Sequence, residues 1–308
     1  MRSLLFPSIA LTLTVLLKTS PVVQVREALS TIPIDNERRP TAETVAVLVV
    51  GSESREEVIV IAAKSLTEHV ITPLKGKYTK VVTTYCLSEL APSTRAQLLI
   101  FGSADESDIL SFEAMGQLER LEICFNKVSE KHGNFSYYVR TRPDSVWLED
   151  MSLSFRHEAI MTRARRISQG RITMQHLSWP TGCDCEEPGC VMVDDMFAII
   201  PFKWKQAYFV VDAALAIVDA ENFTEMPEQI PSDENRLFYL TKDWQTKCPC
   251  ATLWAEGRLT SRLAQHEATI LVHAFNFVLA PPRKDGSEWR QRKWGVRVHV
   301  GDDWRDCG

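Results

Sequence analysis

The sequence has no excess of positive charge. Lys and Arg number 35 against 40 Asp and Glu, which gives a formal net charge of −5 at pH 7. Proteins that bind nucleic acids normally present a basic face to the phosphates, so no nucleic-acid partner is expected. Internal repeats and low-complexity segments are also missing, and the body of the chain is therefore predicted to be one folded unit.

Several local catalytic signatures are absent as well. The chain contains no G-x-S-x-G, G-x4-G-K-[ST], H-E-x-x-H or G-x-G-x-x-G motif. This excludes the usual motifs of α/β-hydrolases, P-loop NTPases, zinc metalloproteases and dinucleotide-binding enzymes. The seven histidines show no metal-ligand spacing, and they are predicted to be structural or exposed.

The N-terminus carries a targeting pattern. Arg2 precedes an apolar run from Leu4 to Leu17, which ends at Lys18. This pattern predicts a signal peptide or signal anchor over residues 1–25, followed by a stem over 26–42. The alternative is a buried N-terminal helix or strand. The first interpretation implies the ER or Golgi lumen, as a type II membrane protein or a secreted one, with membrane contact only through this segment.

Other features agree with a lumenal address. Asn134-Phe135-Ser136 and Asn222-Phe223-Thr224 are acceptor triplets for N-glycosylation. The eight cysteines are an even number, which disulfides can consume in an oxidising compartment. Three of them lie within residues 183–190, and Cys248 and Cys250 form a second cluster. Disulfides between the two clusters are preferred over a zinc site, because the spacing is C-x-C rather than C-x2-C.

The body of the chain alternates between strand and helix patterns. The apolar run Val45–Val50 predicts a buried parallel strand; it stops at Gly51, and a capping box at Ser54 and Glu57 opens a helix. Cys86 and Cys124 fall in expected core elements as buried free thiols. The pattern predicts an α/β fold with a mainly parallel sheet flanked by helices in one domain over 43–308. The further elements expected are strands over Lys80–Cys86, Gln97–Phe101, Phe135–Thr141, Val191–Ile200 and Ala268–Leu279, and helices over Met115–Lys131, Trp204–Val218 and Ser232–Leu240.

One strand end gathers charged residues. The strand that ends at Thr141 delivers Arg140, Arg142 and Asp144 into a loop begun by Pro143. Ligands of open α/β sheets bind outside the carboxyl ends of the strands. Arginines there suit a pyrophosphate, and a carboxylate suits a divalent cation that bridges phosphate oxygens. The equal alternative is a structural ion pair between Arg140 and Asp144 that closes the loop.

Four segments together resemble a known family. The segments GQLERLEICFNKV, VRTRPDSVW, VDDMFAIIPFKWKQAYF and AEGRLTSRL resemble an uncharacterised glycosyltransferase-like family of algae and other eukaryotic microbes, and three of them match it in order and spacing. More distantly, they resemble bacterial surface-polysaccharide transferases with an R-x-R-x-D strand end. The resemblance implies a GT-A-like fold, in which a Rossmann-type half binds a nucleotide sugar.

The resemblance also implies roles for particular residues. Asp144 takes the place of the metal- and diphosphate-binding aspartate, with Mn²⁺ or Mg²⁺ as the cofactor. This sequence departs from the usual D-x-D, because it reads Arg142-Pro143-Asp144 with one carboxylate. A single aspartate and the arginines could neutralise a diphosphate without a cation, so the metal stays open. Gly51 and Ser52 are expected to line the nucleotide.

A second acidic segment, Asp194-Asp195, precedes an apolar run. By resemblance Asp195 faces the acceptor as a general base, with Asp194 beside it. The alternative is that one acid hydrogen-bonds a turn while the other is solvated. Gln117 and Arg120 lie three apart on one helix, so they share a side. They are expected to contact the nucleotide, to make a structural contact to the Arg142 strand, or to form a solvated surface.

The sequence thus predicts a glycosyltransferase. It moves a sugar from a nucleoside-diphosphate donor to a hydroxyl of a glycan, protein or lipid acceptor in the secretory pathway. The first alternative is a lumenal sugar-binding or scaffold protein that has lost catalysis. The second is a glycoside hydrolase, which needs two carboxylates such as Asp144 and Asp195.

Overall fold

The computed structural model describes most of the chain from residue 43 onward. All described residues belong to one compact unit, Arg39–Gly308. None of the described helices is long and apolar enough to span a membrane. The N-terminal segment, Ser54 and the cysteines at 183–190 lie outside the described residues. Those described are 43–52, 56–88, 90–112, 116–151, 154–166, 171–174, 177–180, 191–210, 236–248, 255–273, 275, 277–279, 297–300 and 303–306.

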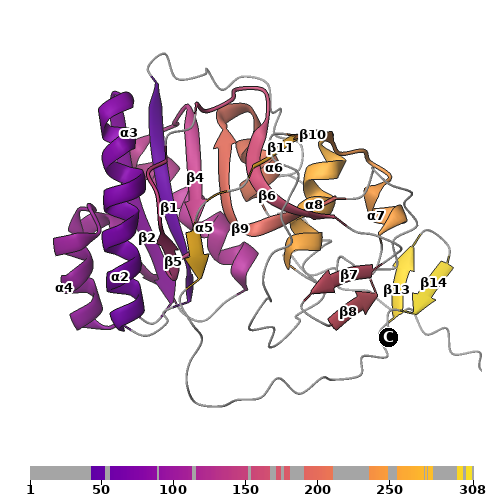
Figure 1. Cartoon of the computed structure of the whole chain (residues 1–308), viewed down its shortest axis with the longest axis horizontal. Coiled ribbons are helices and arrows are strands. Elements are labelled where there is room, and N and C mark those ends of the chain that lie inside the picture. The colour runs from indigo at the N-terminus through magenta and orange to yellow at the C-terminus, as the bar shows by residue number, and fades with distance from the viewer. Residues whose placement is uncertain are drawn as a thin grey trace, which may run out of the picture. The chain divides into compact units, whose positions relative to one another are not determined.

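Strands and helices alternate in the first half of the chain (Figure 1). The elements in chain order are β1 (Thr44–Ser52), α2 (Glu56–Leu66), the π-helix η2 (Thr67–Ile71), α3 (Thr72–Lys77), β2 (Lys80–Ser88), α4 (Pro92–Phe101), the 3-10 helix η3 (Glu106–Asp108), β3 (Ile109–Phe112), α5 (Gln117–His132), β4 (Tyr137–Thr141) and β5 (Ser145–Trp147).

The second half is richer in strands and its helices are short. The elements are β6 (Ile160–Arg166), β7 (Arg171–Met174), β8 (Leu177–Pro180), β9 (Val191–Pro201), the 3-10 helix η4 (Phe202–Trp204), α6 (Lys205–Phe209), β10 (Arg236–Tyr239), α7 (Trp244–Lys247), α8 (Ala255–Gln265), β11 (Thr269–Val272), β12 (Phe277–Leu279), β13 (Arg297–Val300) and β14 (Asp303–Asp306).

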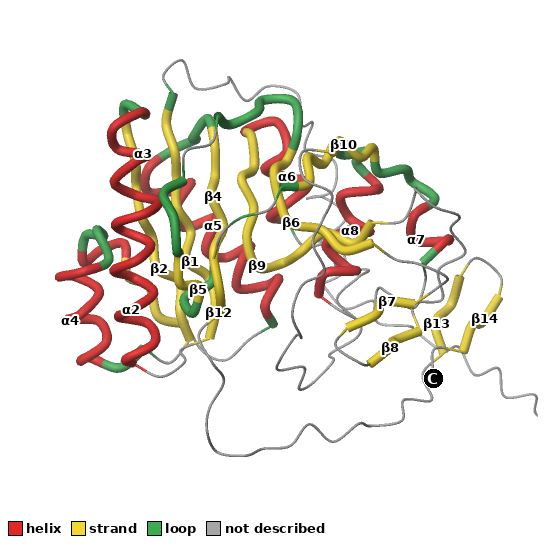
Figure 2. Tube along the Cα trace, in the orientation of Figure 1, coloured by secondary structure: helices red, strands yellow, loops and turns green. Residues whose placement is uncertain are grey.

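Eight of the described strands form one sheet, in the order β10-β11-β6-β9-β4-β1-β2-β3 (Figure 2). The pairs among β3, β2, β1 and β4 are all parallel. β9 runs antiparallel to both of its neighbours, and β10 runs antiparallel to β11. Six strands therefore point one way, and the expected α/β fold with a mainly parallel sheet is confirmed.

The two faces of the sheet are covered by different helices. Alternate residues of a strand point to opposite faces. Val45, Val47 and Val49 accordingly belong to one core cluster with residues of α2, α3 and α4, whereas Ala46 and Leu48 belong to another with residues of α5, α6 and α8. β1 is thus buried on both faces, which explains why its sequence is an unbroken apolar run rather than an alternating one.

The periodicity of α5 agrees with its place on the sheet. Leu118, Leu121, Phe125 and Val128 recur at helical spacing, and all four are buried. The helix ends at Gly133, which has a φ of 77°, a conformation that glycine adopts without a steric penalty. The turn that follows leads directly into β4.

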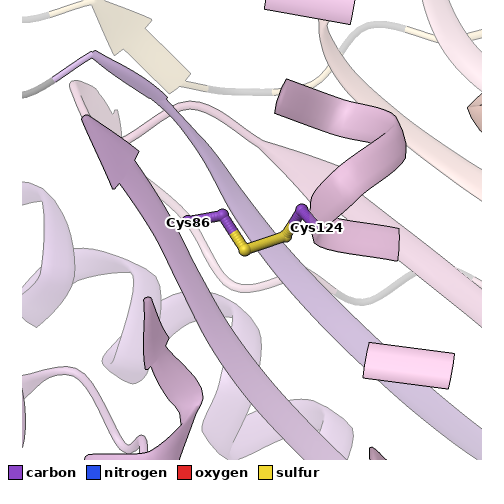
Figure 3. Close-up of a disulfide and its surroundings, with 2 residues drawn as sticks. All are labelled: Cys86 and Cys124. Carbon is purple, nitrogen blue, oxygen red and sulfur yellow. A yellow bond between two sulfur atoms is a disulfide. The ribbon is translucent and has the colours of Figure 1, made fainter. Parts of the chain in front are cut away.

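Cys86 and Cys124 correct the sequence-based expectation. They are not free thiols but form a disulfide between β2 and α5, with a Cα–Cα distance of 5.8 Å (Figure 3). The pattern located each residue in the core but did not reveal that this turn of α5 lies over β2. Cys248 is also disulfide-bonded, in agreement with the preference for disulfides in its cluster.

Several predicted elements are wrong in type or extent. The apolar segment Gln97–Phe101 is the end of α4 rather than a strand, and Pro92 begins that helix at a position where its missing N–H costs nothing. Within Ser232–Leu240 the described residues form strand β10 rather than a helix. The helix expected over Trp204–Val218 is α6, which ends at Phe209. Ala268–Leu279 contains two strands, β11 and β12, in different sheets.

Candidate functional site

The carboxyl ends of β1 and β4 meet at one edge of the sheet. The two strands are paired in parallel up to Val49 and Thr141. Beyond this pair the backbone at Gly51 touches the ring of Pro143: a Cβ on Gly51 would lie 2.4 Å from the proline Cδ. Glycine is therefore required at this position by close approach. Ser52, the last residue of β1, is exposed at the same edge.

Arg142 and Asp144 form a bidentate ion pair just past β4. The Arg142 Nε donates to Asp144 Oδ1 at 2.9 Å, and Nη2 donates to Oδ2 at 2.8 Å. The side chain of Arg142 is 33% exposed and that of Asp144 is 17% exposed. The loop does contain a structural ion pair, but the partner of Asp144 is Arg142 and not Arg140.

The surroundings keep Arg142 charged. Burial lowers the pKa of its guanidinium, but the hydrogen bonds and charge of Asp144, together with the charges of Asp195 and Asp194, outweigh this effect. The net result is a raised pKa. Asp144, Asp194 and Asp195 thus all act on one arginine, although the aspartates come from two distant segments of the chain.

Asp194 and Asp195 lie in an irregular stretch of β9. Between the pairs Thr162–Ala198 and Ala164–Val193, β6 advances by two residues and β9 advances by five. β9 therefore carries three extra residues over 194–197. Such bulges interrupt the two-residue alternation and redirect side chains, and they are common next to active sites.

Asp194 stabilises this bulge. Its side chain is 1% exposed; Oδ1 accepts a hydrogen bond of 2.7 Å from the Met196 backbone N–H. Its Oδ2 lies 3.9 Å from Nε of Arg163 on β6. The contact with Met196 matches the alternative in which one acid of the pair hydrogen-bonds the backbone. We therefore assign Asp194 a structural contribution to the site.

Asp195 faces the start of α5 and the end of β4. Its Oδ2 accepts a hydrogen bond from Nε2 of Gln117, the first residue of α5, and lies 4.0 Å from Nη2 of Arg140. Arg140 is fully buried. Three residues named from the sequence are thus brought together, with Asp195 at their centre.

Tyr208 of α6 completes the same cluster. Burial raises the pKa of its hydroxyl; Arg140 lowers it, and Asp195 and Asp194 raise it further. Sequence reasoning did not single out Tyr208, nor Arg163 of β6. The segment that contains Tyr208 was noted for its resemblance, but nothing in its pattern shows that the hydroxyl faces the β4 arginine.

Arg120 is buried rather than solvated. It is 4% exposed on α5, and this burial lowers the pKa of its guanidinium. Gln117 is half-buried one turn earlier, where it contacts Asp195. Ser52 has no described contact with the charged cluster, so its role as a nucleotide contact stays a prediction.

The described residues do not fit a divalent cation as they stand. Among them, no group of three or more His, Cys, Asp or Glu side chains is placed to hold a metal ion. Mn²⁺ and Mg²⁺ prefer several oxygen ligands, and a carboxylate already bound to a guanidinium offers fewer. The metal role of Asp144 stays a prediction from the sequence. Each aspartate faces its own arginine: Asp144 with Arg142, Asp194 with Arg163 and Asp195 with Arg140.

Comparisons with known proteins give similarities of fold only. No model of a known protein family matches the sequence, and no match to a curated protein is found. One similar solved structure is the galactosyltransferase LgtC in complex with donor and acceptor sugar analogues, with a TM-score of 0.39 and 8% identity over 74% of this chain and 72% of that one. Another is the apo form of the glycosyltransferase GlyE of Streptococcus pneumoniae TIGR4, with a TM-score of 0.34 and 12% identity over 60% of this chain and 41% of that one.

Proposed function

We propose that this chain is a glycosyltransferase that moves a sugar from a nucleoside-diphosphate donor to a hydroxyl acceptor. The observation that carries the proposal is the position of the charged cluster. Arg142, Asp144 and Asp195 gather where the carboxyl ends of parallel β1 and β4 meet the reversed strand β9. Open α/β sheets bind nucleotides and other phosphorylated ligands at this kind of edge.

The chemistry of the cluster suits both substrates. A guanidinium recognises phosphate oxygens through paired hydrogen bonds, and Arg142 is the most exposed of the three site arginines. In the reaction, the bond between the anomeric carbon and the donor phosphate oxygen breaks, and the nucleoside diphosphate leaves with the electron pair. The acceptor oxygen bonds to that carbon, and its proton passes to Asp195.

A lumenal location belongs to the same proposal. Its support is the N-terminal sequence pattern, the two acceptor triplets for N-glycosylation and the disulfide between Cys86 and Cys124, since disulfides persist mainly in oxidising compartments. We expect the full chain, expressed in eukaryotic cells, to be protected from added protease until membranes are dissolved. Degradation of the intact chain without detergent would contradict this location.

The first test is binding of the donor class. Purified protein is heated with a panel of nucleoside diphosphates, and the unfolding midpoint is recorded. A ligand present at about a hundred times its dissociation constant adds ~2.7 kcal/mol to the free energy of unfolding, which gives a clear shift. A shift with one nucleotide supports the proposal and names the donor class. No shift with any of them favours the alternative of a protein that has lost catalysis.

The second test concerns turnover. Asp195→Asn keeps the size of the side chain but removes the base, so donor-sugar transfer should fall by about 10²- to 10⁴-fold. Glu130→Gln changes an exposed acid at the other end of α5 and serves as the matched control. Transfer by Asp195→Asn at the rate of the control would remove Asp195 from the reaction.

A further inference from the structure

We propose that Arg142 receives the donor diphosphate without a metal ion, and that Asp144 is the positioning residue that holds its guanidinium in place. This inference rests on the proposed function and specifies how the donor is held. It gives Asp144 a different role from the metal ligand that the sequence resemblance implies.

The hydrogen bonds of Arg142 leave part of its guanidinium available. A guanidinium has five N–H donors in one plane. Asp144 takes Nε and one donor of Nη2, that is, one side of the plane. Among the described residues no partner is found for Nη1. The remaining donors on Nη1 and Nη2 form a second pair, with the spacing that phosphate oxygens accept.

The same hydrogen bonds occupy Asp144. Both of its oxygens accept from Arg142, at 2.9 and 2.8 Å. A divalent cation bound by Asp144 would therefore have to displace the guanidinium, lose both hydrogen bonds and stand beside the released positive charge. Asp194 and Asp195 do not offer a ready replacement, because each already faces its own arginine.

The charges around Arg142 are consistent with its role. The carboxylates of Asp144, Asp194 and Asp195 together raise its pKa, so the guanidinium remains protonated across the whole physiological range. Arg140 and Arg163 counter two of these negative charges from inside the protein. An incoming diphosphate thus meets one partly exposed cation, Arg142. The charges of Asp194 and Asp195 behind it are balanced by Arg163 and Arg140.

The test measures nucleoside-diphosphate binding by the purified full-length chain, by calorimetry, in EDTA and again in Mn²⁺. We expect dissociation constants that agree within about twofold, and inorganic pyrophosphate should compete in EDTA. Arg142→Met should weaken binding by about 10- to 100-fold, the equivalent of about one lost charge-assisted hydrogen bond. Arg156→Met, at an exposed arginine, is the matched control and should leave the dissociation constant unchanged.

Variants at Asp144 separate the two roles. A positioning carboxylate is partly replaced by an amide oxygen, so Asp144→Asn should retain most of the affinity lost in Asp144→Ala, in EDTA as in Mn²⁺. Binding that requires Mn²⁺ and disappears in Asp144→Asn would overturn the inference and leave the proposed function intact. If no nucleoside diphosphate binds under either condition, the proposed function itself fails, and this inference fails with it.

Discussion

The two halves of the large sheet are built differently. In the half formed by β3, β2, β1 and β4 every pair is parallel, and successive strands are joined through helices. In the half formed by β9, β6, β11 and β10 the direction changes twice, and the register between β6 and β9 shifts. The regular half supplies the platform and the edge at Gly51, and the irregular half supplies Asp194 and Asp195. In a regular strand successive side chains point to opposite faces, so a side chain can point elsewhere only where the regular pairing of the sheet is interrupted.

The largest effect on stability should come from removing the disulfide of the regular half. Cys86→Ala with Cys124→Ala removes a cross-link over 38 residues, which should lower the free energy of unfolding by about 3–4 kcal/mol. Denaturant unfolding of the oxidised protein and of this double variant measures the difference. The double variant is preferred to a reducing agent, because Cys248 is also in a disulfide. Equal stability would mean that α5 is held on β2 by packing alone.

A smaller effect on stability is expected from removing the carboxylate of Asp194 in the irregular half. Asp194→Ala removes the carboxylate that accepts from the Met196 N–H and the negative charge 3.9 Å from Arg163. We expect a loss of about 1.5–3 kcal/mol in the free energy of unfolding. Asp194→Asn, which keeps an oxygen at the same place, should recover part of it. If Asp194→Ala is as stable as the parent protein, the carboxylate does not hold the bulge.

A third stability measurement concerns the close contact between the ends of β1 and β4. Gly51→Ala places a Cβ against the Pro143 ring, which cannot rotate away, and should cost about 1–3 kcal/mol. Gly76→Ala in α3 is the control, because nothing lies within 4 Å of its Cβ and alanine favours a helix. The control should be neutral or slightly more stable. Similar melting points for the two variants would contradict the close approach.

A pH dependence is expected in the second half of the chain. Lys205 of α6 is buried, and this lowers the pKa of its ammonium from 10.5 to about 8. Between these values the unfolded chain binds more protons than the folded one, so stability should rise as the pH increases from about 8 to 10.5. Lys205→Met should show a weaker rise than the parent protein in melting curves recorded at both ends of this range. Parallel curves would assign the rise to other groups.

The sequence predicted β1, β2, β4 and α5 of the regular half for a physical reason, whereas it missed β3. β1 is buried on both faces and reads as an unbroken apolar run, and α5 presents Leu118, Leu121 and Phe125 at helical spacing. Local pattern and final burial agree there. At Gln97–Phe101 they disagree, because an apolar run suggests a strand, whereas Leu99 and Ile100 are exposed on α4. The pattern cannot show which apolar residues remain at the surface.

The sequence identified several residues of the candidate site, but it did not predict which of them contact one another. Arg142 and Asp144 were both named, yet the expected ion pair joined Asp144 to Arg140. Spacing alone does not distinguish Arg140 from Arg142, because residues two apart on an extended segment are expected on the same face. Arg163 and Tyr208 enter through contacts between segments far apart in the chain. Such contacts depend on the register of β6 and β9, which no local pattern contains.

The three extra residues in β9 have an evolutionary consequence. Adding or deleting one residue in a regular strand would turn every following side chain to the opposite face. Between Val193 and Ala198 the alternation is already broken, so a change of length there leaves the paired residues on either side in register. A change in the number of residues in this stretch can thus be accommodated while the sheet on either side keeps its pairing.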